Sequence, residues 1–365
     1  MEASRLAART MRVRDRLSKE GLGSLWVTGL TNIRYLTGFT GSFAQLLVGA
    51  DRSVFLTDGR YREQSETEVS GCEIEVFRGK PWARAFAEVL RDRSEGSVGY
   101  EAAHLTCEGL EKVRSALGEG ADREWRPTSG WIEEGRLSKD EGEIDRLRRS
   151  GRVVDRVYRE LLEHFVEGVT ELEIFRRTMN LFWEHGASDA SFDPIVLFGA
   201  RSSLPHGKPS EARLRKGDWV LLDFGAVVEG YCSDCTRTFV YGEPTAMQRE
   251  RRDCVKRAHE AAIAAARPGI PCREVDKVAR GVLAEAGLED AFIHGLGHGI
   301  GLEIHEGPRL NDTTEETLAE GMTVTIEPGV YFPGWGGIRI EDAVVVRTGG
   351  AEPLTRCDSS IQPFD

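Results

Sequence analysis

The sequence lacks long apolar stretches, because no hydrophobic run approaches the roughly 20 residues that a membrane-spanning helix requires. The first twenty residues, Met1 to Glu20, mix arginine, glutamate and lysine throughout, so they do not resemble an export signal with an apolar centre. We therefore expect a soluble protein that stays in the cytoplasm.

Excess positive charge is also absent. The chain has 60 acidic residues against 48 lysines and arginines, which gives a formal net charge of −12. Nucleic acids and anionic membranes attract proteins through basic surfaces, so this balance disfavours both as partners. A small molecule or a peptide is the expected partner.

A disulfide framework is the third missing feature. The seven cysteines are odd in number and scattered from Cys72 to Cys357, which favours reduced thiols. Cys232 and Cys235 have the C-x-x-C spacing, but no second pair completes a zinc site. They also lie in a strand-like run rather than at the start of a helix, which argues against a redox motif.

With 365 residues, the chain is long enough for two domains. Apolar spacing predicts an opening helix around residues 6–17, strands near 25–27, 46–48 and 54–56, and helices near 82–90 and 105–117. Residues 1–125 are therefore interpreted as a small α/β domain without a concentrated cluster of metal ligands. Glycines, charges and Pro127 interrupt the periodicity after it, so 126–138 is expected to be a linker before a catalytic domain over 139–365.

The second part shows the same order of elements twice. Ser138 with Glu141, and Thr170 with Glu173, have the spacing of capping boxes that open two helices before strands near Ile195, 220–224 and 231–240. Helices over about 246–266 and 273–286 then precede strands near 322–326 and 338–346. This order indicates two similar α+β halves, although no residue-level repeat accompanies it.

Four carboxylates interrupt these apolar strands: Asp223, Asp234, Glu327 and Glu341. An ionised carboxylate removed from water costs several kcal/mol unless a cation or strong donors compensate it. Any one of them alone could pair with an arginine or cap a turn. As a group, their four negative charges exceed the single positive charge of Arg339, the only basic residue embedded beside them. Two divalent cations would supply four positive charges.

Histidine supplies the nitrogen ligand that such a site can use. His298 lies in a glycine-rich segment, where small residues let the backbone approach a crowded centre, and completes a set suited to Mn²⁺, Co²⁺, Zn²⁺ or Fe²⁺. The segment lacks the G-x-G-x-x-G spacing of a dinucleotide loop. His206, in a polar loop, and His294 and His305, near His298, remain candidates for a site. Helical or surface positions explain the other four: His104, His164, His185 and His259.

These motifs together resemble the creatinase/prolidase-type metallopeptidases, which include Xaa-Pro aminopeptidases, Xaa-Pro dipeptidases and methionine aminopeptidases. The similarity extends along the chain and leaves all five ligand positions intact, unlike the metal-free creatinase branch. It is carried by Ser191-Phe192-Asp193, Pro205-His206-Gly207, Asp223-Phe224-Gly225, Ser233-Asp234-Cys235-Thr236-Arg237-Thr238, Gly297-His298-Gly299-Ile300-Gly301, His305-Glu306, Glu327-Pro328-Gly329 and Arg339-Ile340-Glu341-Asp342.

The resemblance implies an α+β "pita-bread" catalytic domain after a smaller N-terminal α/β domain of the creatinase type, which helps to form a homodimer. It implies two divalent cations, with manganese the family-based expectation. Asp223 would hold one cation, His298 and Glu327 the other, and Asp234 and Glu341 would bridge them.

The resemblance also implies catalytic roles and a substrate. His206, His294 and His305 would contact the substrate or stabilise the intermediate, Arg339 would orient ligand carboxylates, and Glu327 would pass a proton to the leaving group. The long N-terminal part favours hydrolysis of an N-terminal Xaa-Pro bond. The substrate could be a dipeptide, whose free carboxylate Arg309 would bind, or a longer peptide. Two other functions also stay open: a binding protein on this fold without peptidase activity, and a hydrolase of a non-peptide amide.

Overall fold

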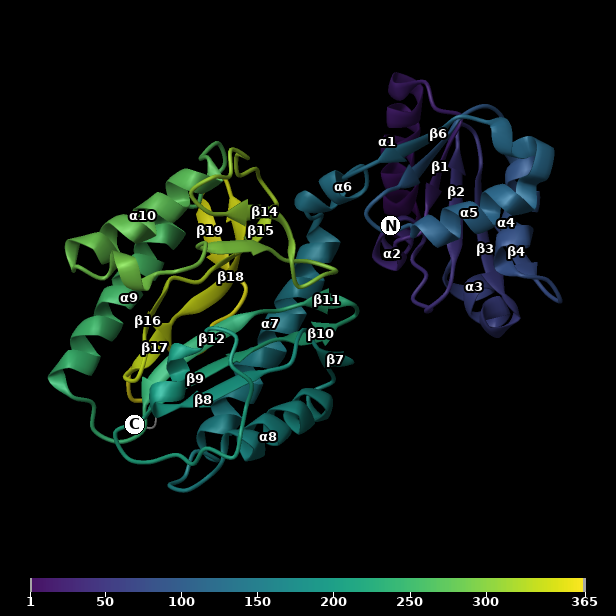
Figure 1. The fold of residues 1–365 in the computed structure, drawn as a ribbon. Helices are drawn as coiled ribbons and strands as arrows, with labels where there is room; N and C mark the ends of the chain where they lie inside the picture. Colours follow the sequence, from purple (N-terminus) through teal and green to yellow (C-terminus); the bar gives the residue numbers. More distant parts are fainter. Residues whose placement is uncertain (1, 364–365) are drawn as a thin grey trace. The chain divides into compact units, whose positions relative to one another are not determined.

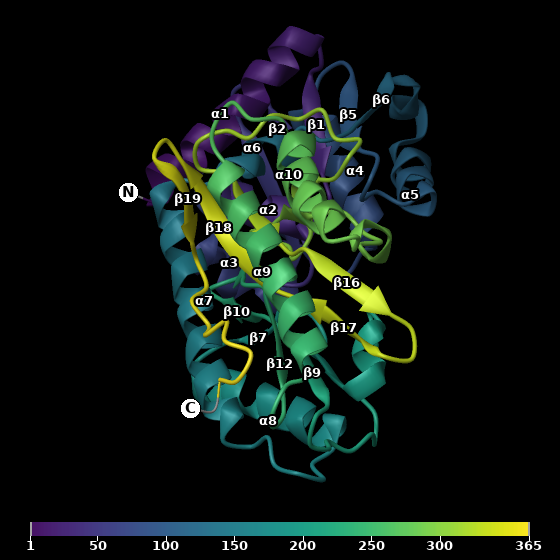
Figure 2. The same cartoon turned by 90° about the vertical axis from the view of Figure 1, so that its left-hand side faces the viewer.

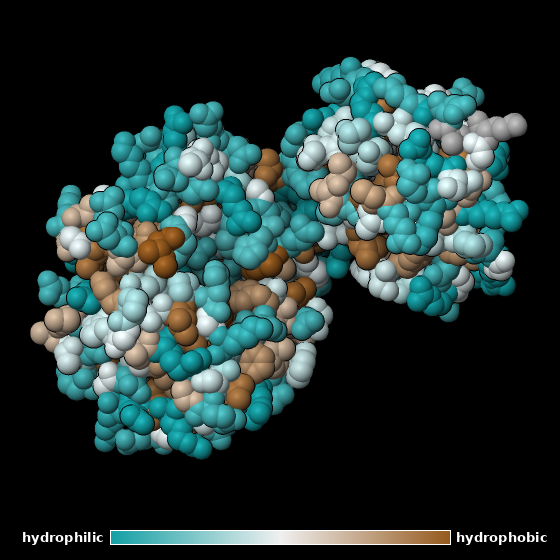
Figure 3. All heavy atoms as spheres, viewed as in Figure 1, coloured by the Kyte–Doolittle hydropathy of each residue, from teal (hydrophilic) through white to brown (hydrophobic). Residues whose placement is uncertain are grey.

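The computed structural model describes residues 2–363, and the chain divides into two compact units between Arg136 and Leu137 (Figure 1). Within these residues, no helix is both long and apolar enough to cross a membrane. Figure 3 shows that apolar side chains on the viewed face are interspersed with hydrophilic ones. All seven cysteines are free thiols, as the sequence predicts.

The first unit is built on a mixed six-stranded sheet. Strands β1 and β2, and β2 and β3, pair antiparallel, whereas β3 with β4, β1 with β5 and β5 with β6 pair parallel. In spatial order the strands are β4 (Glu73–Phe77), β3 (Ser53–Asp58), β2 (Gln45–Gly49), β1 (Ser24–Val27), β5 (Val98–Glu101) and β6 (Trp125–Thr128).

Helices pack on this sheet around a core that includes Trp26 and Phe86, whose ring centroids lie 4.6 Å apart. The helices are α1 (Glu2–Glu20), α2 (Leu30–Thr37), α3 (Arg62–Glu68), α4 (Trp82–Arg93), α5 (Cys107–Leu117) and α6 (Glu133–Leu137), with short 3₁₀ helices η1 (Gly59–Tyr61) and η2 (Gly118–Asp122). The predicted α/β character of this part, including the opening helix and the strands near 25, 46 and 54, is confirmed.

The second unit is built on an antiparallel sheet of eight strands, which carries the site described below. In spatial order they are β14 (Glu306–Leu310), β13 (Gly297–Gly299), β15 (Thr323–Ile326), β18 (Glu341–Arg347), β12 (Cys235–Val240), β9 (Trp219–Phe224) and β8 (Ile195–Phe198), with β19 (Gly350–Pro353) beside β18. A three-stranded sheet, β11 (Tyr231–Cys232), β10 (Ala226–Val228) and β7 (Asp189–Ala190), and a hairpin, β16 (Gly329–Phe332) with β17 (Gly336–Arg339), adjoin it.

Two helix pairs cover one side of the eight-stranded sheet (Figures 1 and 2). They are α7 (Glu141–Leu162) with α8 (Glu171–Glu184), and α9 (Ala246–Ala265) with α10 (Cys272–Glu285); η3 (Gly199–Ser203) and η4 (Glu289–Ala291) are short 3₁₀ helices. Each pair has its own hydrophobic core against the strands. Val220, Leu222 and Phe224 of β9 enter the core below α7 and α8, so Leu221 and Asp223 face the other side.

The predicted order of elements is confirmed, including the helices expected near 246–266 and 273–286 and the strands near 322–326. One predicted strand is wrong in detail. The run 338–346 divides at Ile340, with β17 before it and β18 after it. Arg339 and Glu341 therefore belong to different sheets.

The first helix of the second unit begins two residues later than predicted. Ser138 and Glu141 have the spacing of a capping box, but Asp140 and Glu143 form it. The Asp140 side chain accepts hydrogen bonds from the amides of Gly142 and Glu143, while Glu143 accepts one from the amide of Asp140. The second predicted box, Thr170 with Glu173, is confirmed.

We predict that Asp140→Ala lowers the free energy of unfolding by about 1 kcal/mol, because the first turn of α7 loses its acceptor. Ser138→Ala is the matched control and should change the free energy by less than roughly 0.5 kcal/mol. Urea unfolding followed by circular dichroism measures both. A larger loss in Ser138→Ala than in Asp140→Ala would contradict the assignment of the cap.

Candidate metal centre

Strand register brings the predicted acids together on the side of the sheet opposite the helices. Thr236 of β12 pairs with both Asp223 of β9 and Glu341 of β18, so these three side chains form one row across the sheet. Glu327 directly follows β15, whose last residue, Ile326, pairs with Asp342. Glu327 therefore lies beside Glu341 at the end of this row.

Asp234 and His298 lie beside this row. One ligand atom from each of Asp234, His298 and Glu341 falls within 4.8 Å of the others, and all three residues are buried. His298 Nε2 lies 3.6 Å from Asp234 Oδ2 and 3.6 Å from Glu327 Oε1. Four of the five predicted metal residues therefore lie close together: Asp234, His298, Glu327 and Glu341.

Asp223, the fifth, is held by Arg339. Its Oδ2 accepts a hydrogen bond of 2.5 Å from Arg339 Nη2, whereas its buried Oδ1 has no hydrogen-bond partner. The same guanidinium donates to Thr236 Oγ1 and to Tyr331 Oη. Arg339 therefore orients Asp223 through one carboxylate oxygen and leaves the other without a hydrogen bond from the protein.

The protonation state of His298 leaves a lone pair facing these acids. Its Nδ1 lies 3.0 Å from the carbonyl oxygen of Gly299, which only accepts hydrogen bonds, so Nδ1 carries the hydrogen. Burial lowers the pKa of His298 to about 4, so the ring is neutral and Nε2 is an acceptor. A cation between Nε2 and the carboxylates removes the repulsion among acceptors.

The acids themselves are poorly compensated by the polypeptide. Burial, together with the neighbouring carboxylates, raises the pKa of Asp234 and of Glu341 well above the usual range. Burial also raises the pKa of Glu327 to about 7, although Arg339 opposes this shift. With Asp223 Oδ1 unpaired as well, this oxygen-rich set with one imidazole fits divalent metal ions.

The acids lie in a cavity of about 900 Å³ that contains all the other predicted catalytic residues. His206 and His305 are exposed within it, and the ring centroid of His305 lies 4.4 Å from that of His298. Burial and then the charge of Arg309 lower the pKa of His305. The apolar wall of the cavity is formed by Leu172, Phe175, Phe192, Pro194, Ile195 and Ile304.

His294 is more constrained than the other two cavity histidines. Its Nδ1 donates to the carbonyl oxygen of Gly295 at 2.8 Å, and its Nε2 accepts from Tyr331 Oη at 2.9 Å. Burial lowers the pKa of His294 to about 4, so the ring stays neutral. Tyr331 thus links His294 to Arg339, a role that the sequence did not reveal.

Thr236 is a second participant that sequence reasoning missed. Its hydroxyl donates to Glu341 Oε2 at 2.5 Å and accepts from Arg339 Nε at 3.0 Å. The only available signal was its place between Asp234 and Thr238 in a motif already singled out. Thr236 fixes the relative positions of Arg339 and Glu341.

The opposite face of the same strands carries a separate charged group. Arg237 of β12 is buried and donates to Asp342 Oδ1 at 2.8 Å. His259 Nε2 lies 3.4 Å from Asp342 Oδ2. Because Asp342 follows Glu341, alternation places one acid on each face of β18.

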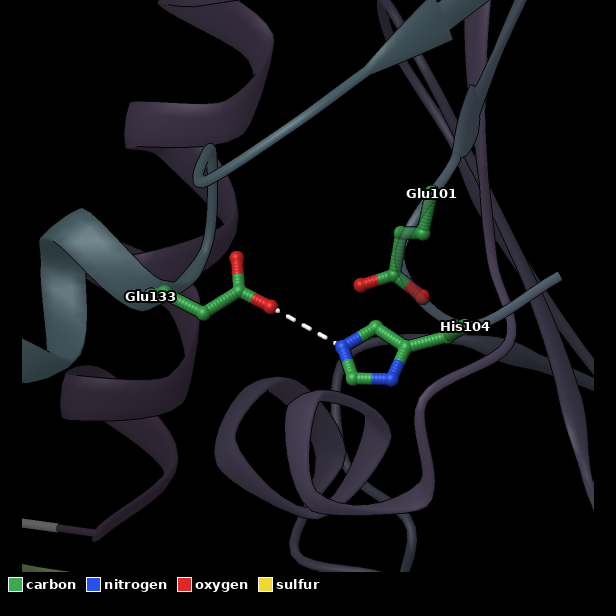
Figure 4. Close-up of side chains that lie close together, drawn as sticks. All are labelled: Glu101, His104 and Glu133. Atoms are coloured by element: carbon green, nitrogen blue, oxygen red, sulfur yellow. Dashed lines mark hydrogen bonds and ion pairs between the residues drawn. The ribbon is translucent and has the colours of Figure 1, made fainter. Parts of the chain in front are cut away.

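The first unit contains a second cluster of metal-ligating types, which the sequence did not predict. Glu101 ends β5, His104 follows it, and Glu133 approaches them from the start of α6 (Figure 4). Hydrogen bonds with the protein hold the side chains of these three residues. Glu101 accepts from the amides of Thr28 and Gly29, and Glu133 Oε1 lies 3.1 Å from His104 Nε2.

Asn32 occupies the place between the two carboxylates of that cluster. Its amide nitrogen donates to Glu101 at 2.6 Å and to Glu133 at 2.7 Å. Arg136 donates to the Asn32 carbonyl oxygen at 2.8 Å. The cluster therefore ties the residues before α2, and Asn32 within it, to α6.

Two family models match the chain, one in each of its two parts. The model of metallopeptidase family M24 matches residues 145–348, and the creatinase/prolidase N-terminal domain matches residues 9–138. The chain belongs to metallopeptidase family M24. The expected class of enzyme and the expected fold, a pita-bread catalytic domain after a creatinase-type N-terminal domain, are confirmed.

Relatives of this M24 metallopeptidase cover nearly its full length. It is 41% identical over 347 residues to the Xaa-Pro dipeptidase of Pyrococcus furiosus, covering 94% of this chain and 97% of the relative. The solved Xaa-Pro dipeptidase from Bacillus anthracis superposes with a TM-score of 0.92 at 36% identity, covering 98% and 99%. The X-Pro aminopeptidase from Thermotoga maritima gives 0.88 at 33%, covering 93% and 97%.

We predict that Glu327 makes the metal-free M24 metallopeptidase progressively less stable than its Glu327→Gln variant as pH rises from about 5 to 7. Glu327 keeps its proton in the fold up to a pKa of about 7, whereas the unfolded chain releases it near pH 4, so its contribution is fully present below pH 4, is lost as pH rises to 7 and stays constant above that. One proton contributes about 1.4 kcal/mol per pH unit, or roughly 2–4 °C in Tm. His294 and His298 oppose this trend, because burial lowers their pKa to about 4 whereas an unfolded histidine still binds a proton near pH 6.5, so the comparison with Glu327→Gln is what isolates the glutamate.

Thermal unfolding with chelator and with Mn²⁺ measures this effect. The stabilisation by Mn²⁺ should grow with pH, because metal binding and protons compete for the same carboxylates. Glu327→Gln is the reference that lacks this proton, and its advantage in metal-free Tm over the unsubstituted protein should grow from pH 5 to 7 and then level off. A difference in metal-free Tm between the two proteins that stays constant from pH 5 to 7 would contradict the prediction.

Proposed function

We propose that this chain hydrolyses N-terminal Xaa-Pro peptide bonds with the help of two divalent cations. The observation that carries the proposal is the convergence of the five predicted ligands in one cavity, with the lone pair of His298 Nε2 facing carboxylates at 3.6 Å. The proline-directed activities in the names of the relatives support the choice of bond.

We assign Asp223 to one cation, His298 and Glu327 to the other, and Asp234 and Glu341 to both. The free Oδ1 of Asp223 and the clustering of Asp234, His298 and Glu341 support this assignment. Two bound cations supply Lewis acidity for the scissile carbonyl and lower the pKa of the attacking water. Manganese is the proposed metal.

The chain's own residues handle protons and orientation. We assign Glu327, whose Oε1 lies 3.6 Å from His298 Nε2 in the cavity, proton transfer to the leaving proline nitrogen. His305, whose pKa is lowered by burial, has one N–H to donate to the developing oxyanion. Arg339 holds Asp223 through the bond from its Nη2.

His206 and His294 are assigned to substrate contact. His206 is exposed in the cavity, and its ring is therefore accessible to a bound peptide. Both nitrogens of His294 are engaged, with Gly295 and with Tyr331, so we place its ring carbons against the substrate. A neutral His294 in this position adds no charge beside the acids.

Selection of proline follows from the chemistry of its nitrogen. The Xaa-Pro amide carries no N–H, so an enzyme that recognises this hydrogen has nothing to bind, whereas an apolar pocket can select the ring. Phe192, Pro194 and Ile195 provide an apolar wall beside Asp223. We propose that the proline ring lies against this wall.

Arg309 favours dipeptides as substrates. It pairs with His298 across β13 and β14, is exposed, and lines the cavity. A guanidinium at this position can bind the free carboxylate of a dipeptide through paired hydrogen bonds. We therefore propose Xaa-Pro dipeptides as the preferred substrates, with longer peptides as the alternative.

Two further expectations remain proposals of the same kind, a homodimer and a cytoplasmic location in keeping with seven free thiols. Of the expected division into 1–125, a linker over 126–138 and a catalytic domain over 139–365, the linker differs from the fold, because β6 pairs in the sheet of the first unit and that unit extends to Arg136. Size-exclusion chromatography with light scattering tests the dimer directly.

We predict that metal-loaded protein contains about two metal ions per chain and cleaves Ala-Pro, whereas Asp223→Ala loses at least one ion and about 100-fold or more in kcat/KM. Metal analysis coupled to a peptide panel measures both. Full activity at far fewer than two ions per chain would contradict the dinuclear scheme. Peptide binding without cleavage would favour a binding protein, and cleavage of only non-peptide amides would favour the third alternative.

We predict that Arg309→Met raises KM for Ala-Pro by roughly 10- to 100-fold, since a hydrogen bond to a charged group contributes about 1.5–3 kcal/mol. Cleavage of Ala-Pro-Gly-Gly should change little, because its carboxylate lies elsewhere. Arg273→Met, outside the cavity, is the matched control. Equal effects of Arg309→Met on the two peptides would contradict carboxylate recognition.

A further inference from the structure

The three cavity histidines outside the metal set lie on irregular segments rather than inside regular elements. His206 follows η3, His294 lies between η4 and β13, and His305 lies between β13 and β14. A reacting group misplaced by about 1 Å can cost on the order of 100-fold in rate, so such segments must be held firmly if their histidines act on a substrate.

A buried ion pair closes the segment of His206. The Glu171 side chain is fully buried and accepts from the amides of Phe198 and Ser210, which lie before and after the segment. Arg201 pairs with Glu171 at 3.1 Å and donates to the carbonyl oxygen of Lys208 at 2.7 Å. Both ends of the segment are thereby tied to the start of α8.

A second pair holds the segment of His294. Asp276 of α10, with 1% of its side chain exposed, pairs with Arg280 at 2.7 Å and accepts from the amide of Leu296 at 3.0 Å. Arg280 donates to the carbonyl oxygens of Phe292 and His294, the latter at 2.6 Å, and its guanidinium lies over the Phe292 ring. The backbone of His294 is therefore fixed from α10.

A third pair lies next to His305. Glu306 and Lys139 expose 4% and 1% of their side chains and are 3.0 Å apart. Glu306 also accepts from the amide of Glu303, so it bridges the turn that contains His305. Lys139 is anchored in turn by the bond from its own amide to the carbonyl oxygen of Gly321.

The three pairs share one arrangement. In each, a buried carboxylate binds a basic side chain and at least one backbone amide of the segment that carries His206, His294 or His305. Stability alone does not account for this arrangement, because a buried ion pair is often no more stabilising than apolar residues of similar volume. Directional hydrogen bonds to the segment are what an apolar replacement would lack.

We propose that these ion pairs are positioning devices for the catalytic histidines: Glu171–Arg201 for His206, Asp276–Arg280 for His294 and Glu306–Lys139 for His305. None of the six residues belongs to the proposed metal set. The roles of the histidines rest on the proposed function, whereas the immobilisation of their segments does not.

The pair Asp276–Arg280 gives the sharpest test, because one quarter of the Arg280 side chain is exposed and its loss should leave the protein folded. We compare Asp276→Asn, Arg280→Met, the double variant and Lys277→Met. Lys277 lies on the same helix with 78% of its side chain exposed and is the matched control. Tm, metal content, kcat, KM and hydrogen exchange of residues 290–298 are measured in Mn²⁺.

Arg280→Met should lower kcat for Ala-Pro by roughly 10- to 100-fold with a smaller change in KM, and should speed hydrogen exchange of residues 290–298 at unchanged metal content. The double variant removes both buried charges, so its Tm should recover toward wild type while kcat and exchange do not. Lys277→Met should match wild type in every measurement.

Recovery of kcat together with Tm in the double variant, or unchanged exchange in Arg280→Met, would overturn the proposal and leave the pair as a stabilising contact only. Loss of metal in Arg280→Met would also overturn it, by assigning the pair to the metal centre. If wild type cleaves no Xaa-Pro substrate, the proposed function fails, and hydrogen exchange alone decides whether the pair immobilises the His294 segment.

Discussion

The structure of the second unit depends on four carboxylates and one neutral imidazole that share a cavity in which the buried guanidinium is that of Arg339, whereas Arg309 is exposed. One positive charge on Arg339 cannot compensate Asp223, Asp234, Glu327 and Glu341, and burial shifts the last three toward protonation. Such a site is stable only with its protons or with cations in their place. The rigid antiparallel sheet is what keeps these groups from moving apart.

Alternation along the strands separates packing from chemistry. On β9, Leu222 and Phe224 enter the core below the helices, whereas Asp223 faces the cavity. The helices and the apolar face thus provide stability, and the other face is free to hold groups that would destabilise a core. Arg339, which comes from the separate β16–β17 hairpin, reaches the same site from outside the main sheet.

Much of this could be predicted from the sequence, because the signals were local. Helices such as Ala246–Ala265 follow from apolar spacing, and acids inside apolar strands mark a site before its geometry is known. Partners distant in sequence could not be predicted. The contact of Tyr331 with His294, the meeting of Glu133 with Glu101, and the pairing of Lys139 with Glu306 depend on tertiary register. The prediction of Ser138 as the cap of α7 was wrong because two candidate spacings, Ser138 with Glu141 and Asp140 with Glu143, overlap in the sequence.

The pair of acids Glu341 and Asp342 shows how one strand can serve two electrical environments. Behind the sheet, Asp342 is neutralised permanently by Arg237, a cation that belongs to the chain. In front, Glu341 receives only the hydroxyl of Thr236 from its own strand neighbours. Arg237 is thus a permanent counterion on the face of the sheet that packs against the helices. On the cavity face, charge compensation is left to ions from solution, so it depends on the composition of that solution.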